Sequence, residues 1–192
     1  MTRTKTQKMV QIALIGALYT VLTLAVAPIS FGAVQFRISE ALTLLPLFSP
    51  VGIWGLAFGC LVSNLIGFFT GLNPIGLIDA PVGTLATLLA GLVTYYIGRR
   101  DFHAEQHKDR LAKMILGALP PVLFNGAIIG LELTLVFGGE PGQNFAALYA
   151  FNAGSVAFGE LAVCYTLGMA LCAVLWRRDL YKRCFGETGC VH

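Results

Sequence analysis

An arginine and a glutamate lie three residues apart in residues 34–40 (VQFRISE), between two long apolar stretches. A charged side chain beside a membrane core is costly unless it is paired or used, so Arg37 and Glu40 are candidates for a functional site. Side chains three residues apart are also neighbours on a helix. A structural Arg37–Glu40 ion pair at a helix end is therefore the competing interpretation of this stretch.

Further polar side chains interrupt the apolar stretches that follow. They are three asparagines and three carboxylates: Asn64, Asp79, Asn125, Glu132, Asn152 and Glu160. The asparagines could simply form hydrogen bonds between helices, whereas an isolated buried carboxylate must be paired or neutralised. Together with Glu40, four carboxylates face one arginine, a nominal excess of three negative charges. Either some of them are protonated, or the site binds a ligand rich in hydrogen-bond donors or positive charge.

The composition of the chain is that of a membrane protein. Of its 192 residues, 56% are hydrophobic and only 12% are charged, and the mean hydropathy is +0.75. In soluble domains about a quarter of all residues are charged. We therefore expect residues 1–192 to form a single all-α membrane domain, and the net charge of +3 does not indicate nucleic-acid binding.

The apolar runs predict six membrane-spanning helices, at residues 9–27, 36–49, 51–69, 81–98, 114–137 and 145–176. The run 36–49 is shorter than the usual span of about 20 residues. It is included because lysines and arginines cluster in the head, in residues 99–113 and after residue 176. If all three clusters face the cytoplasm, an even number of crossings must separate the head from residue 99. Only the short run can supply the fourth crossing.

This topology places both termini, the loop 99–113 and the tail 177–192 in the cytoplasm, together with 12 of the 13 lysines and arginines. The polar residues named above then fall mostly in the outer parts of their helices. We expect a polar pocket that opens to the outside and is closed beneath by apolar packing. Small residues at four-residue spacing, such as Gly55 and Gly59 or Gly126 and Gly130, predict close packing of helices within the bundle.

Sequence motifs of several enzyme classes are missing. The chain has no GxxxxGK[ST] loop to hold ATP phosphates, no HExxH and no GxSxG. Its one closely spaced histidine pair, His103 and His107, falls in the charged loop and outside the predicted spans. We therefore expect no metal site, no cofactor and no enzymatic activity.

Four segments of the chain resemble the QueT family, the substrate-binding S components of energy-coupling-factor (ECF) transporters for queuosine precursors. The longest is residues 27–46 (APISFGAVQFRISEALTLLP). The others are Asp79 with residues 83–90 (GTLATLLA), Asn125 with residues 130–133 (GLEL), and residues 159–161 (GEL). The resemblance implies a six-helix protein of the bacterial plasma membrane that binds its ligand at the outer face. It also implies a membrane coupling subunit and two separate ATPase subunits as partners, which agrees with the missing phosphate-binding loop.

The ligand implied by the resemblance is a 7-deazaguanine such as preQ1, preQ0 or queuine. A carboxylate can accept the N1–H and the exocyclic amine of a guanine-like edge together. The flat ring requires a stacking partner, for which Phe36 is the best candidate. The expected substrate-binding residues are Gln35, Phe36, Arg37, Glu40, Asn64, Asp79, Asn125, Glu132, Asn152 and Glu160.

A second expected site lies on the first helix. In the family an AxxxA motif on this helix packs on the coupling subunit, and Ala13 and Ala17 match that position. Packing within the bundle is the alternative role for this pair.

Two other functions remain open at this point. An S component for another vitamin would share the fold and the partners and differ only in its ligand. A stand-alone proton-coupled transporter would use Glu132 and Glu160 as a proton relay and would need no ATPase subunits.

Overall fold

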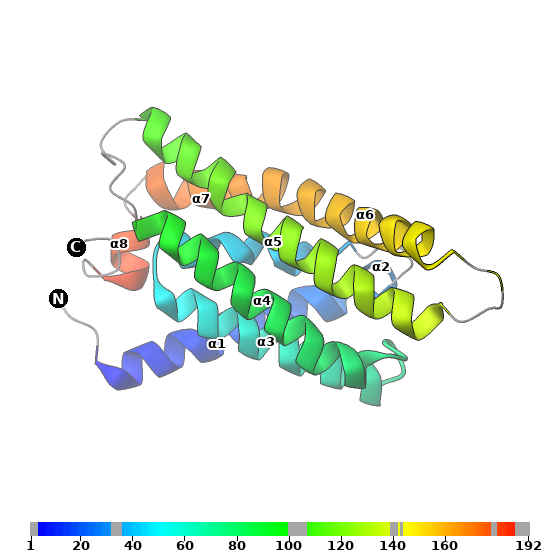
Figure 1. Ribbon diagram of the computed structural model, residues 1–192. Helices are drawn as coiled ribbons and strands as arrows, with labels where there is room; N and C mark the ends of the chain where they lie inside the picture. Colours follow the sequence, from blue (N-terminus) through cyan, green and yellow to red (C-terminus); the bar gives the residue numbers. More distant parts are fainter. Residues whose placement is uncertain are drawn as a thin grey trace.

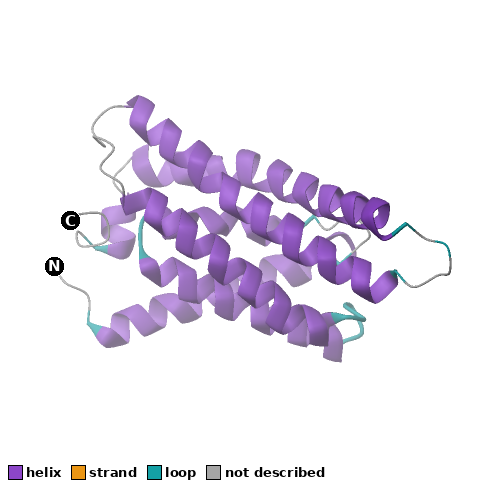
Figure 2. Ribbon diagram, in the orientation of Figure 1, coloured by secondary structure: helices purple, strands orange, loops and turns teal. Residues whose placement is uncertain are grey.

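The structure is a computed structural model that describes residues 4–31, 36–99, 107–138, 142, 144–177 and 180–186. All regular elements in these ranges are helices (Figure 2), and the long ones lie side by side in a bundle (Figure 1). In chain order they are α1 (Lys5–Ala25), α2 (Ala27–Ser30), η1 (Ile38–Leu47), α3 (Pro50–Phe69), α4 (Gly76–Arg99), α5 (His107–Phe137), α6 (Phe145–Val163), η2 (Cys164–Gly168), α7 (Met169–Arg177) and α8 (Leu180–Phe185). The predicted all-α architecture is confirmed.

Five segments of the described chain are long and apolar enough to cross a membrane. They are Lys5–Ala25, Pro50–Phe69, Gly76–Arg99, Asp109–Phe137 and Phe145–Arg177, and they correspond to five of the six predicted spans. The last is continuous through α6, η2 and α7, because η2 is a single π-helical segment between two α-helices. The sixth span and the cytoplasmic location of the termini remain predictions.

The predicted short span 36–49 is a 3-10 helix, η1, over residues 38–47. It contains Pro46, which has no N–H to donate, and Pro50 follows soon after it. Every residue from Ser39 to Leu47 is buried, so neighbouring helices enclose the segment. A 3-10 helix rises about 2.0 Å per residue, so its ten residues reach about 20 Å, further than an α-helix of the same length.

Several predicted boundaries were wrong by up to seven residues. The first helix ends at Ala25, two residues early, and Pro28 lies inside the short helix α2 instead of opening a loop. Helix α4 begins at Gly76 instead of residue 81, so Pro81 lies inside it. Helix α5 begins at His107 instead of residue 114. Pro28 costs little because it is the second residue of α2, where the N–H groups have no helical partner. Pro81 is the sixth residue of α4 and leaves the carbonyl of Leu77 without its helical donor. The charged residues 107–113 extend α5 past its apolar part.

Small residues bring the helices together, as predicted. A Cβ atom at Gly55 of α3 would lie 2.7 Å from the Ile15 side chain of α1. At Gly130 of α5 it would lie 2.5 Å from the Cα atom of Ala153 in α6. These separations leave no room for a side chain, so glycine sets the distance between the helix backbones.

The start of α1, the end of α4, the start of α5 and the helix α8 lie at the same end of the bundle (Figure 1), and this end is positively charged. The cations there are Lys5, Lys8, Arg99, Arg110, Lys113, Arg177, Lys182 and Arg183. Phe48, at the end of η1, packs there against the rings of Trp176, Tyr181 and Phe185. This aromatic cluster closes the end of the bundle that we predicted to be cytoplasmic.

Replacing Gly130 with alanine should destabilise the bundle, because the new methyl group would overlap the backbone of α6 at Ala153. Overpacking of this kind costs about 1–3 kcal/mol. The melting temperature of the purified protein in detergent measures the effect. Gly154→Ala is the matched control, because nothing lies within 4 Å of a Cβ atom there. Equal melting temperatures for the two variants would contradict the close α5–α6 approach.

Candidate functional site

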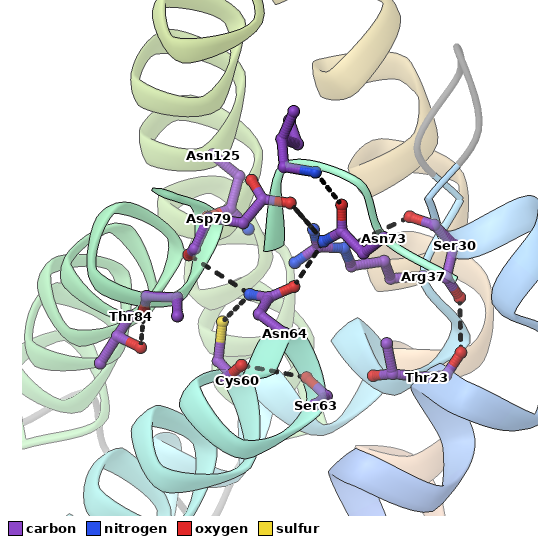
Figure 3. Close-up of polar contacts among 12 residues, drawn as sticks. Thr23, Ser30, Arg37, Cys60, Ser63, Asn64, Asn73, Asp79, Thr84 and Asn125 are labelled. Atoms are coloured by element: carbon purple, nitrogen blue, oxygen red, sulfur yellow. Dashed lines mark hydrogen bonds and ion pairs between the residues drawn. The ribbon is translucent and has the colours of Figure 1, made fainter. Parts of the chain in front are cut away.

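Arg37, in the segment between α2 and η1, is a cation buried within the bundle. Its side chain is 6% exposed, and its Nη2 atom lies 3.7 Å from Oδ2 of Asp79 in the first turn of α4. Its Nε atom donates to the carbonyl oxygen of Ser30 at 3.5 Å, and its guanidinium lies over the Phe31 ring, 5.6 Å from the centroid. These contacts hold the charge in place (Figure 3).

Hydroxyl groups attach the segment around Arg37 to α1. The Ser30 hydroxyl donates to the carbonyl oxygen of Thr23 at 3.0 Å, and the Thr23 hydroxyl donates to that of Ser39 at 2.7 Å. All three side chains are buried. Ser30, before Arg37, and Ser39, after it, are therefore both hydrogen-bonded to Thr23 of α1.

Two asparagines connect the loop after α3 to this charged centre. The amide of Asn73 donates to Oδ2 of Asp79 at 2.7 Å and to Oδ1 of Asn64 at 3.3 Å. Asn64 in turn donates to the backbone carbonyl of Asp79 at 3.3 Å. Figure 3 shows these side chains converging on Asp79. Asn64 therefore holds the start of α4 and the loop before it in place.

Glu132 of α5 approaches the same centre. Its carboxyl group lies within electrostatic reach of Asp79, whose charge opposes its own, and of Arg37, whose charge attracts it. No N–H or O–H group of another described residue donates to either carboxyl oxygen of Glu132 or to Oδ1 of Asp79, but the two carboxyl groups lie within hydrogen-bonding reach of each other. Two buried carboxyl groups thus share one arginine.

A second carboxyl pair, Glu40 of η1 and Glu160 of α6, lies within electrostatic reach of each other. Protein donors already serve most of its oxygens. The Tyr19 hydroxyl donates to Oε1 of Glu40, and the Asn125 amide donates to Oε1 of Glu160 at 2.7 Å. The Cys164 thiol lies 3.7 Å from Oε2 of Glu160. Only Oε2 of Glu40 has no partner in the described part of the chain.

The unpartnered atoms define what this site can bind. Polar groups buried without partners cost free energy. Here they are one arginine nitrogen and four carboxyl oxygens: Arg37 Nη2, Glu40 Oε2, Asp79 Oδ1, Glu132 Oε1 and Glu132 Oε2. The set offers many acceptors and a single charged donor. It suits a ligand that carries several N–H groups and at least one acceptor.

Seven of the expected site residues come together here, from five different elements and the segment before η1: Arg37, Glu40, Asn64, Asp79, Asn125, Glu132 and Glu160. Asp79 lies in the first turn of α4, and Arg99 in the last turn of the same helix. Phe36 is half-buried beside Arg37, Asn152 donates instead to the Thr134 hydroxyl at 3.0 Å, and Gln35 lies outside the described residues. Ala13 and Ala17 are exposed on α1.

Three further side chains belong to the site and were not predicted from the sequence as binding residues. Tyr19 and Asn73 bond directly to site carboxylates. Cys164, within the predicted span 145–176, lies between the Glu40 backbone carbonyl and the Glu160 carboxyl group. The only signal in the sequence was that Tyr19 and Asn73 are polar groups beside or within apolar runs.

Comparisons with known proteins agree with this picture. The family model described as "QueT transporter" matches residues 9–177. The "Queuosine precursor transporter QueT" of Lactococcus lactis subsp. cremoris (strain MG1363) is 36% identical over 91 residues, which cover 46% of this chain and 50% of that relative. The match therefore spans about half the length of the curated relative. No solved structure matches the chain.

The family match covers most of the chain and includes all five segments of spanning length except residues 5–8 of the first. Together these findings fit a multi-pass protein of the bacterial plasma membrane, and a transporter family implies a role other than catalysis. The chain belongs to the QueT transporter family.

Proposed function

We propose that this chain is the substrate-binding subunit of an ECF-type transporter and captures a queuosine precursor at the outer face of the membrane. The observation that carries the proposal is the group of buried, unpartnered polar atoms on Arg37, Glu40, Asp79 and Glu132. A membrane protein retains such groups at a cost unless a ligand completes them. The ligand class comes from the family and from the name of the Lactococcus relative.

The chemistry of a 7-deazaguanine matches the site. Its N1–H and exocyclic amine are adjacent donors suited to carboxyl acceptors. One of them can donate to Oε2 of Glu40, the oxygen of the Glu40–Glu160 pair that has no hydrogen-bond partner among the described residues. Its carbonyl oxygen is an acceptor that Nη2 of Arg37 can serve. Phe31, already under the guanidinium, and the half-buried Phe36 are the aromatic rings nearest to Arg37 along the chain.

Energy for uptake would come from partner subunits, because the chain has no phosphate-binding loop. The face of α1 that carries Ala13 and Ala17 is suited to a coupling subunit. In the most apolar 18-residue stretch of α1, only 28% of the residues are buried, and this is the smallest share among the five segments of spanning length. Small exposed residues at four-residue spacing let a partner helix approach closely.

Glu40→Gln and Glu160→Gln should each weaken binding of preQ1 to the purified chain in detergent by about tenfold or more, because each removes a charged acceptor. Isothermal titration calorimetry measures the affinity, and size-exclusion chromatography checks that the variants remain folded. Asp109→Asn makes the same chemical change at the opposite end of the bundle and should leave binding unchanged. Wild-type affinity in both glutamate variants would remove these carboxylates from the site.

Ala13→Leu should leave ligand binding intact and abolish ATP-driven uptake, because the larger side chain would separate α1 from the coupling subunit. Uptake of labelled preQ1 by cells that express the coupling subunit and both ATPases measures this. Ala146→Leu enlarges an exposed alanine on α6 and should have no effect. Uptake at the normal rate by Ala13→Leu would exclude this face as the docking surface. Uptake that needs no ATPase and stops with an uncoupler would instead indicate a proton-coupled transporter.

A further inference from the structure

The two carboxyl pairs of the site differ in how many of their oxygens the protein itself serves. At the Glu40–Glu160 pair, Tyr19, Asn125 and Cys164 supply donors, and one oxygen is left without a partner. At the Asp79–Glu132 pair, three oxygens receive no donor from any other described residue, and the two carboxyl groups have only each other within hydrogen-bonding reach. The open acceptors of the site are therefore concentrated between α4 and α5.

We propose that Asp79 and Glu132 form a subsite for a positively charged amine of the ligand. This inference rests on the proposed function and deepens it, because it selects among the 7-deazaguanines. The favoured ligand would carry an alkylammonium group, as preQ1 does on its aminomethyl arm. PreQ0 has the same base with a neutral nitrile in that position.

Burial and charge both support an ammonium ion at this place. The Glu132 side chain is 5% exposed and that of Asp79 is 1% exposed, so water serves their free oxygens poorly. Arg37, with its Nη2 atom 3.7 Å from Asp79, can balance one of the two negative charges. An uncompensated buried carboxylate is strongly unfavourable. The pair must therefore either share a proton or face a cation that the ligand supplies in its place.

The hydrogen-bonding capacity of an ammonium group also fits. It has three N–H donors and no acceptor, and the free acceptors are Oδ1 of Asp79 and the two oxygens of Glu132. The second oxygen of Asp79 is already used by the Asn73 amide at 2.7 Å. That bond fixes the Asp79 carboxyl group and leaves Oδ1 free. The described lysines lie in α1, α5 and α8, at or near the positively charged end, so none supplies this cation from within the chain.

The inference is tested by titrating preQ1 and preQ0 separately into the purified full-length chain in detergent. We expect the wild-type chain to bind preQ1 about 10- to 100-fold more tightly than preQ0, because charge-assisted hydrogen bonds are strong. Glu132→Gln should remove most of this preference by weakening preQ1 binding, while the affinity for preQ0 changes less than about threefold. This variant keeps the shape of the side chain, and its amide can still hydrogen-bond to the neighbouring Asp79 carboxyl group.

Glu160→Gln is the matched control, since it changes the other carboxyl pair in the same way. It should weaken preQ1 and preQ0 binding alike, because both ligands share the base. Equal affinities of the wild-type chain for preQ1 and preQ0 would overturn the amine subsite and leave the proposed function standing, and this comparison needs no variant. A preference that survives Glu132→Gln, or an equal loss of both ligands in that variant, would also overturn it. Binding of neither ligand by the wild-type chain would overturn the proposed function and the subsite together.

Discussion

The structure depends on one arginine placed among carboxyl groups in the interior of a largely apolar bundle. Arg37 is held by Asp79, by the carbonyl oxygen of Ser30 and by the ring of Phe31. In a medium of low polarity a charge of this kind must be surrounded by opposite charge and donors or acceptors. Helices α3, α4, α5 and α6 and the 3-10 helix η1 each supply a polar side chain to the region around it.

Much of this arrangement could be predicted from the sequence, because lipid imposes strong rules. Long uncharged runs predicted all five segments that are long and apolar enough to cross a membrane. Glycine spacing indicated packing that the α1–α3 and α5–α6 contacts confirm. Carboxylates such as Glu132 and Glu160 stood out because isolated charges are rare in apolar helices. In the structure Glu132 lies within electrostatic reach of Asp79, and Glu160 within that of Glu40.

Other features could not be predicted because they arise from contacts between distant residues. The 3-10 geometry of η1 depends on the helices that enclose it, and no periodicity in residues 38–47 indicates it. Asn73 falls between the predicted spans 51–69 and 81–98, yet its amide donates hydrogen bonds to both Asn64 and Asp79. The hydroxyl of Tyr19 finds its acceptor on Glu40, 21 positions along the chain. Helices α4 and α5 begin earlier than predicted. Hydropathy does not indicate a helix there, because the first residues of α4 precede a proline and those of α5 are mostly polar or charged.

The enclosure of η1 has a consequence for how the protein is assembled. A helix that faces lipid can enter the bilayer on its own, since its apolar side chains favour the hydrocarbon. Residues 39–47 are all buried against other parts of the protein, and ten residues are fewer than an independent insertion step requires. Its position therefore depends on the elements around it, which are chiefly α1, α3, α4, α5 and η2. The placement of Arg37 and Glu40 depends on the same neighbours, because Arg37 directly precedes η1 and Glu40 lies within it.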